Sequence, residues 1–205
     1  MLGGSKRWVH NEVRFLLDVD SGHLCVMLSA KDIDTEKIEE QRMLEAARTD
    51  KMTKLLNRET TMEEIRKILT EEYAKVHVLY MVDIDNFKSL NDTLGHQAGD
   101  NFLIELAGAI KGCFRDSDII GRIGGDEFFV FMRNTPNQAV IERKAQELLE
   151  VIQQVCESYP EIPLSASIGI STYPKKGDKV EELYGQADMA LYDAKRKGKN
   201  QYVYA

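Results

Sequence analysis

The stretch GRIGGDEFFVF, residues 121–131, predicts a β-hairpin whose turn carries two acidic side chains. Gly124 and Gly125 form the turn, and the apolar run behind them has the composition of a strand. A plain hairpin does not need Asp126 and Glu127 directly behind its turn. Glycines let a polyphosphate approach the main chain, and a neighbouring carboxylate can hold phosphates only through a shared divalent cation. Taken alone, the stretch fits equally well a tight turn with solvated acids.

A second acidic group, in DIDNFKSLND, residues 83–92, stands at the end of an apolar run that predicts a strand buried on both faces. Asp83 and Asp85 lie on the same side of an extended segment, so they can jointly bind a hard cation such as Mg²⁺. Lys88 adds a charge that suits a phosphate. The alternative is that these aspartates only end a strand and cap a helix. Two carboxylate groups at the ends of neighbouring strands favour a shared site.

The remaining pattern predicts an α/β (α+β) domain with a ferredoxin-like, palm-like central antiparallel sheet flanked by helices. The expected order is helix 60–75, strand 77–84, helix 102–114, the hairpin around Gly124-Gly125, helix 141–159, strand 164–170, helix 180–198 and strand 201–205. Ahead of this domain, residues 7–31 predict an N-terminal β-hairpin that turns at Asp20-Ser21-Gly22. Residues 34–48 predict a polar connector helix with Thr35 as its N-cap. The predicted divisions are therefore 1–33, 34–49 and 50–205.

Composition excludes several classes of protein. The 205 residues are 43% apolar and 30% charged, and no apolar run approaches the roughly 20 residues of a membrane span. The isolated Cys25, Cys113 and Cys156 suggest neither a disulfide framework nor a zinc site. A formal charge of −7 disfavours a broad nucleic-acid surface. We expect a cytoplasmic chain without nucleic-acid or membrane contact.

Four segments, in order, resemble the motifs of GGDEF-type diguanylate cyclases. They are DKMTKLLNR (50–58), DIDNFKSLNDTLGHQAGD (83–100), RIGGDEFFV (122–130) and ADMALYDAKRKGKNQY (187–202). The similarity runs from about Asp50 to Tyr204. The N-terminal hairpin and AKDIDTEKIEEQ (30–41) resemble the last strands and exit of a PAS-like sensor module, of which they would be a C-terminal remnant.

The resemblance implies condensation of two GTP molecules into cyclic di-GMP and two pyrophosphates with Mg²⁺ or Mn²⁺. By position, Asp83, Asp126 and the main-chain carbonyl of Ile84 would hold the metal. The resemblance places Asp126 and Glu127 in the catalytic turn: Asp126 would accept the proton of the attacking 3′-hydroxyl, and Glu127 would reach a second metal or only support the loop, without a separate catalytic role. The residues implied in substrate binding are Lys88, Asn91, His96, Asp100, Gly124, Gly125, Lys195 and Lys199. Asn91 and Asp100 would face guanine, whose N1–H and amine they can accept.

The segment RDSD, Arg115 to Asp118, matches the family's inhibitory RxxD site by its place ahead of Gly124. The resemblance implies that cyclic di-GMP binds there and inhibits the enzyme, whereas an Arg and Asp three apart are otherwise a weak surface pair. Three positions depart from the common pattern. Met52 and Lys54 replace Leu and Gly, and Lys199 replaces Arg, which loses bidentate phosphate contact.

These observations predict a diguanylate cyclase that works as a two-fold symmetric homodimer, one GTP to each copy. The alternative is a non-catalytic GTP-binding or cyclic di-GMP-binding regulatory domain on the same fold. The presence of Asp83, Asn91, Asp100 and Asp126 disfavours that alternative. A palm-like nucleotidyl transferase acting on nucleic acid would also use paired metal carboxylates, but the acidic balance disfavours it.

Overall fold

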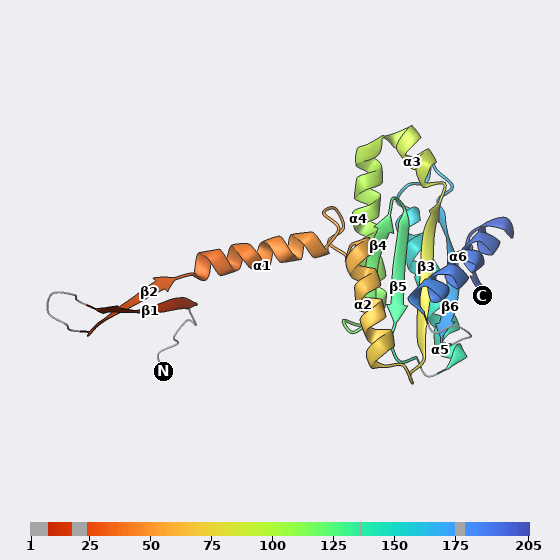
Figure 1. Cartoon of the computed structure of the whole chain (residues 1–205). Helices are drawn as coiled ribbons and strands as arrows, with labels where there is room; N and C mark the ends of the chain where they lie inside the picture. Colours follow the sequence, from red (N-terminus) through yellow and green to blue (C-terminus); the bar gives the residue numbers. More distant parts are fainter. Residues whose placement is uncertain (1–7, 18–23, 136, 175–178) are drawn as a thin grey trace, which may run out of the picture. The chain divides into compact units, whose positions relative to one another are not determined.

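The computed structural model describes residues 8–17, 24–135, 137–174 and 179–205, and it divides the chain into the units Met1–Ala47 and Arg48–Ala205. In the first unit, β1 (Val9–Leu17) pairs antiparallel with β2 (Leu24–Asp32), and α1 (Asp34–Arg48) follows (Figure 1). The predicted turn at Asp20-Ser21-Gly22 lies outside the described residues. The N-cap prediction for Thr35 is wrong, because the helix begins at Asp34, whose carboxylate accepts the main-chain N–H of Trp8.

A five-stranded sheet with the order β4-β5-β3-β6-β7 forms the centre of the second unit. Its strands are β3 (His77–Asp85), β4 (Ile119–Gly124), β5 (Glu127–Met132), β6 (Ser165–Tyr173) and β7 (Gln201–Tyr204). Neighbouring strands are antiparallel except β6 and β7, which are parallel. The order of β3, β4, β5 and β6 confirms the predicted ferredoxin-like arrangement, and β7 extends it by one edge strand.

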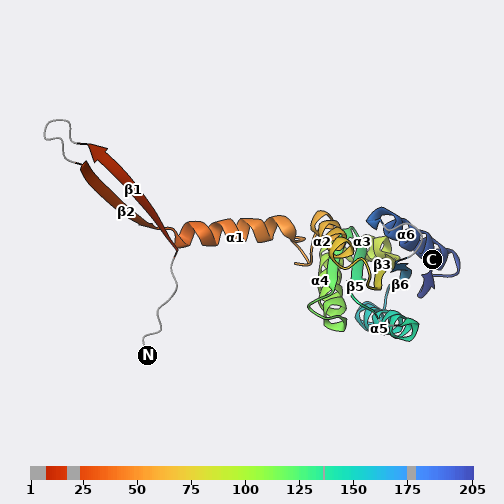
Figure 2. The same cartoon turned by 60° about the horizontal axis from the view of Figure 1, so that its bottom comes forward.

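Helices cover both faces of this sheet (Figure 2). One face packs against α4 (His96–Cys113) and α5 (Gln138–Cys156), and the other against α2 (Arg58–Glu71) and α6 (Val180–Arg196). Alternation along β3 divides its side chains between these two cores: Val78, Tyr80 and Val82 face α4 and α5, whereas Leu79 and Met81 face α2 and α6. The prediction that this strand is buried on both faces is confirmed. Its last two odd-numbered residues, Asp83 and Asp85, therefore point to the side of α6.

Two helices occupy the segment between β3 and β4, where the sequence pattern predicted one. The short helix α3 (Phe87–Leu94) follows β3 directly, and α4 begins after Gly95, whose φ of 84° breaks the helical path. Within the described residues, no helix is both long enough and apolar enough to cross a membrane.

Candidate functional site

Three carboxylates gather where β3 ends beside the β4–β5 turn. Asp83 is the register partner of Glu127 on the neighbouring strand. The N–H of Ile84 donates to the main-chain oxygen of Asp126 at 3.3 Å, which fixes the turn against the end of β3. The pairing of β3 with β5 thus brings the two acidic groups of the sequence together at one end of the sheet, as predicted.

The carboxylate cluster, formed by Asp83, Asp126 and Glu127, carries more negative than positive charge. Burial raises the pKa of Asp83 and the charges of Asp126 and Asp85 add to that effect, while the ammonium of Lys195, 2.7 Å away, opposes it. Burial also raises the pKa of Glu127, and the charges of Asp83 and Asp126 raise it further. Since a carboxylate whose pKa is raised is held unfavourably in its charged form, a divalent cation would relieve this cluster.

The protein side chains do not complete a metal site by themselves. In the described part of the chain, no three Asp, Glu, His or Cys side chains are grouped so that they could hold a metal ion. A cation shared by Asp83 and Asp126 would therefore take its remaining ligands from main-chain oxygens or from a bound molecule, which fits a phosphate-bearing substrate.

Asp85 has a different role from Asp83, although both lie on one side of β3. Its carboxylate accepts hydrogen bonds from the hydroxyls of Ser165 and Ser167, at 2.7 and 2.9 Å, and from the N–H of Asn200 at 3.2 Å. These donors come from the start of β6 and from the turn before β7. Asp85 is thus a structural acceptor that links β3 to β6 and to the turn before β7, and its engaged oxygens do not support the predicted cation site shared by Asp83 and Asp85.

The turn between β4 and β5 consists of Gly125 and Asp126, one residue later than predicted, because Gly124 still pairs with Glu127 in the hairpin. Its glycine is open to solvent. Gly125 has a φ of 38°, and a Cβ added there would meet no atom within 4 Å. A Cβ on Gly124 would meet only the Glu127 carboxylate, at 3.9 Å. The turn therefore leaves main-chain atoms accessible beside the carboxylates, as approach of a polyphosphate requires.

Arg122 holds this turn through hydrogen bonds to its main chain, a role that the sequence analysis did not predict. Its Nη2 and Nε donate to the carbonyl of Gly125 at 2.7 and 3.0 Å, and its Nη1 reaches the Asp50 carboxylate at 3.2 Å. The Asp50 carboxylate also accepts the hydroxyl of Thr53 at 2.7 Å. Both charged residues stand inside the recognised motifs, but their 72-residue separation gave no sign that they are partners.

The predicted guanine-binding residues lie on the two helices that follow β3. Asn91 is on α3 and Asp100 on α4, and the Asn91 side chain lies over Gly99, where a Cβ would come within 2.0 Å of its Oδ1. Lys88 and His96 are exposed on the same helices. Among the described residues, no hydrogen bond or ion pair joins these four side chains to Asp83 or Asp126.

Lys195 and Lys199, both implied in substrate binding by the resemblance, take different positions. Lys195 lies in the carboxylate cluster through its ion pair with Asp83. Lys199 instead donates to the side-chain oxygen of Asn86 at 2.9 Å, and Asn86 donates to the Pro163 carbonyl at 2.7 Å. Asn86 has a φ of 64° in the turn between β3 and α3. In the structure, Lys199 thus anchors a turn near the cluster.

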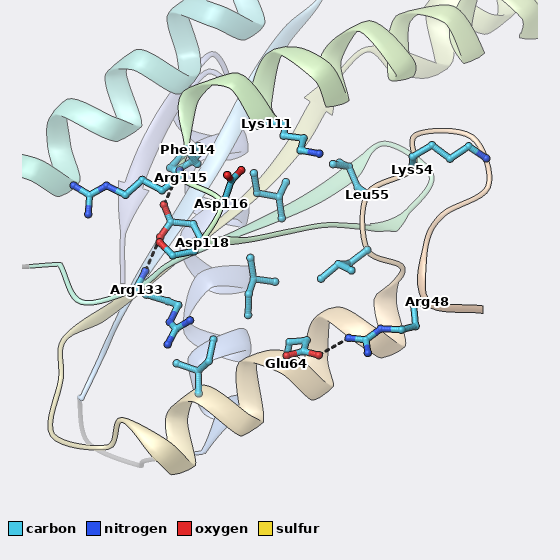
Figure 3. A pocket seen from close by; sticks show the side chains of 15 residues that line it. Arg48, Lys54, Leu55, Glu64, Lys111, Phe114, Arg115, Asp116, Asp118 and Arg133 are labelled. Atoms are coloured by element: carbon cyan, nitrogen blue, oxygen red, sulfur yellow. Dashed lines mark hydrogen bonds and ion pairs between the residues drawn. The ribbon is translucent and has the colours of Figure 1, made fainter. Parts of the chain in front are cut away.

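Arg115 and Asp118 lie at the other end of the sheet, on the rim of a pocket of about 430 Å³ (Figure 3). The Asp118 carboxylate accepts the N–H groups of Arg115 and Arg133, each at 3.1 Å. The cationic residues that line the pocket are Arg48, Lys54, Lys111, Arg115 and Arg133. An adjoining hollow of about 190 Å³ includes Thr135, whose buried hydroxyl has no hydrogen-bond partner among the described residues. The predicted inhibitory pair therefore borders a cation-rich cavity, with Asp118 engaged by main-chain donors.

Comparison with known families gives a match to the model for the diguanylate cyclase GGDEF domain over residues 47–201. Diguanylate cyclase A of Treponema denticola is 35% identical over 170 residues, which cover 80% of this chain and 46% of that protein. The bifunctional diguanylate cyclase/cyclic di-GMP phosphodiesterase MucR of Pseudomonas aeruginosa is 38% identical over 168 residues, 80% of this chain and 24% of that protein. The uncharacterized protein YtrP of Bacillus subtilis is 37% identical over 82% of this chain and 28% of its own length. The chain thus spans less than half the length of these relatives.

Solved structures give the same result. The coiled coil and GGDEF domain of DgcB from Caulobacter crescentus, in complex with c-di-GMP, superposes with a TM-score of 0.73 at 28% identity and covers 83% of this chain and 93% of that one. The GGDEF domain of PA1120 from Pseudomonas aeruginosa gives a TM-score of 0.70 at 33% identity, with 77% of this chain and 94% of that one covered. The N-terminal hairpin lies outside residues 47–201, which the family model matches, so its resemblance to a sensor module stays a prediction.

Proposed function

The chain belongs to the GGDEF family of diguanylate cyclase domains, and from that premise we propose that it condenses two GTP molecules into cyclic di-GMP and two pyrophosphates. The observation that carries this proposal is the cluster of Asp83, Asp126 and Glu127 beside an open glycine turn. A degenerate, non-catalytic member would have no need to keep three mutually repelling carboxylates at one strand end.

The cluster suits the metal that this reaction requires. Asp83 and Asp126, with the main-chain carbonyl of Ile84, would hold Mg²⁺ or Mn²⁺. When bound, such a cation supplies charge that stabilises the phosphoryl group under attack and lowers the pKa of the attacking hydroxyl. Asp126 accepts the proton of that 3′-hydroxyl. Gly124 and Gly125 leave room for the phosphates along the main chain.

Guanine selectivity comes from the helices after β3. Asn91 and Asp100 accept from the N1–H and exocyclic amine of the base, and adenine would leave these acceptors unpaired, which costs binding energy. Lys88 and His96 contact the nucleotide from the exposed side of α3 and α4. The close approach of Asn91 to Gly99 supports this assignment, since it orders the amide before substrate arrives.

Catalysis requires two copies, because each domain holds one GTP and the product joins two. A two-fold arrangement places each bound nucleotide opposite the other, and α1 serves as the connector that aligns the copies. We also propose the division 1–33, 34–49 and 50–205, with the first part as the end of a PAS-like sensor. The start of the matched family region at residue 47 supports the second boundary.

Cyclic di-GMP would inhibit through Arg115 and Asp118. The cation-rich pocket beside them suits a ligand with two phosphates, and the Arg115 guanidinium can contact guanine or phosphate. Initial rates measured with micromolar cyclic di-GMP test this part. We expect a clear reduction, and rates that do not change would contradict it.

Chromatography of the nucleotides formed from GTP and Mg²⁺ tests the main proposal. The concentrated chain, freed of copurified product, should form cyclic di-GMP, and the Asp126→Ala variant should form none. If the chain produces none even when a dimerising tag is fused to its N-terminus, the non-catalytic nucleotide-binding alternative becomes the better account.

A further inference from the structure

Lys195 forms an ion pair inside the carboxylate cluster, at the position where the proposed metal would act. It comes from the last turn of α6, and its Nζ lies 2.7 Å from Oδ2 of Asp83 at the end of β3. The Asp83 side chain is 12% exposed and that of Lys195 is 38% exposed. Within the described part of the chain, Lys195 is the one side chain that makes an ion pair with Asp83.

This single ammonium compensates more than one acid. Its charge acts on Asp83 and also on Glu127, while Arg58 adds a weaker contribution at Glu127. In the metal-free protein, Lys195 therefore replaces part of the positive charge that the cluster needs. Without it, Asp83 would be a largely buried carboxylate facing two others, which is an unfavourable arrangement.

Lys195 and a divalent cation compete for the same oxygen. A metal ligated by Oδ2 of Asp83 and an ammonium 2.7 Å from that atom would place two positive charges within a few ångströms of each other. The lysine side chain is free to leave, because its flexible stem borders an open pocket of about 460 Å³. That pocket is lined by Glu127, Asp188, Met189, Leu191, Tyr192, Asp193 and Lys195.

We propose that Lys195 is an internal counter-ion, which neutralises Asp83 until a metal–nucleotide complex arrives and then moves from Asp83 to the phosphates. This inference rests on the metal site proposed above. It predicts that the metal binds better together with the nucleotide than alone. A free metal would displace the Lys195 ammonium from Asp83 and leave that ammonium without a partner. A metal bound to its nucleotide brings phosphate oxygens, to which the displaced ammonium can move. The chain would then bind the metal–nucleotide complex more tightly than the free metal.

Binding of Mn²⁺ alone, followed by electron paramagnetic resonance without nucleotide, tests the proposal. The Lys195→Gln variant should bind Mn²⁺ about three- to tenfold more tightly than the natural chain, because the competing charge is gone. The Lys197→Gln variant is the matched control, since it removes the same charge from an exposed residue just beyond α6, and its affinity should stay within about twofold. Lys195→Arg, which keeps the charge, should bind Mn²⁺ like the natural chain.

A second titration separates competition from general electrostatics. For a non-hydrolysable GTP analogue with Mg²⁺, calorimetry should show about tenfold weaker binding to Lys195→Gln, the opposite direction from Mn²⁺ alone. Equal or weaker Mn²⁺ binding by Lys195→Gln would overturn the proposal and make the ion pair a permanent structural contact. Neither experiment depends on turnover, so an inactive chain does not decide it. If Asp126→Asn binds Mn²⁺ as well as the natural chain does, the metal assignment itself is wrong.

Discussion

The two ends of the central sheet both carry acidic side chains, which are paired with positive charge at one end and crowded together at the other. Where β3 begins, Glu72 lies 2.6 Å from Nη2 of Arg133 and 3.3 Å from Nζ of Lys75, and the hydrogen bond from Arg133 lowers its pKa. Asp118 nearby accepts two main-chain N–H groups. Where β3 ends, the cluster of Asp83, Asp126 and Glu127 shares Lys195, and burial and mutual repulsion raise the pKa of Asp83 and of Glu127.

The difference separates charges that serve the fold from charges that await a ligand. Paired and hydrogen-bonded acids need no further partner, whereas a cluster with too little positive charge lowers its free energy when a cation binds. The same distinction separates two aspartates of β3. Asp85 accepts hydrogen bonds from three donors, whereas Asp83, two residues earlier, makes an ion pair with Lys195.

The largest effect should follow from removing the proposed proton acceptor. Asp126→Asn keeps the size of the side chain but cannot accept the proton or hold a cation well, so we expect cyclic di-GMP formation to fall by at least about a thousandfold. The rate of product formation from GTP and Mg²⁺ measures it. Glu181→Gln is the control, since Glu181 pairs with Arg66 on the surface, and its rate should remain unchanged. If Asp126→Asn kept a tenth or more of the natural rate, Asp126 would not be the proton acceptor.

A change at the structural aspartate should affect folding. Asp85→Ala leaves the hydroxyls of Ser165 and Ser167 and the N–H of Asn200 without their acceptor, and we expect about 2–4 kcal/mol less free energy of unfolding. Urea unfolding of the chain measures this. Asp83→Asn is the comparison, because it removes a charge that the metal-free fold does not need, and it should cost less than about 1 kcal/mol. Equal losses would erase the distinction between the two aspartates.

A smaller gain in stability should result from neutralising Glu127. Its pKa in the folded state is raised above the ordinary 4.5, so the charged form opposes folding at pH 7, and that cost disappears as the pH falls through the raised value. Glu127→Gln should therefore raise the free energy of unfolding at pH 7 by up to about 1 kcal/mol, allowing for solvent screening. The advantage should vanish near pH 4. Thermal unfolding without metal at both pH values measures it, and an advantage that grows at low pH would have the wrong sign.

The smallest effect on stability should come from the backbone at Lys54, near the end of the sheet where the acids are paired. Lys54 lines the pocket beside Arg115 and has a φ of 61°, a conformation that favours glycine. Lys54→Gly should raise the free energy of unfolding by about 0.5 kcal/mol, since the relief of strain exceeds the entropy that glycine adds to the unfolded chain. Chemical unfolding measures it, with Lys51→Gly as the exposed control that should not stabilise. A destabilised Lys54→Gly variant would show that the side chain matters more than the backbone there.

The sequence predicted the strands, the layers and the meeting of the two acidic segments, because buried strands and turn residues have strong local patterns. It did not predict which acids would be paired or hydrogen-bonded within the fold and which would lack enough positive charge. The donors to Asp85 come from Ser165 and Ser167, about eighty residues away, and only the register of β3 with β6 brings them together. The support of the glycine turn by Arg122 depends on tertiary contact in the same way.

Two predictions about helices were wrong. The helix α3 was not predicted, and α4 begins at His96 and not at residue 102, because the expected helix was placed on the apolar repeat that starts at Phe102. Gly95, with its positive φ, separates the two helices. Thr35 was assigned as a cap on residue type, but Asp34 already lies in the helix. Neither error changes the position of the site, which lies at the ends of β3 and of the β4–β5 hairpin.

Anomalous diffraction from crystals grown with Mn²⁺ and a non-hydrolysable GTP analogue tests the central claim most directly, because it locates the metal without any assay of turnover. We predict an anomalous peak within bonding distance of the carboxylates of Asp83 and Asp126, with Lys195 moved from Asp83 to the phosphates. An ordered nucleotide with no metal peak between these two aspartates, or a nucleotide held only in the pocket beside Arg115 and Asp118, would contradict the account.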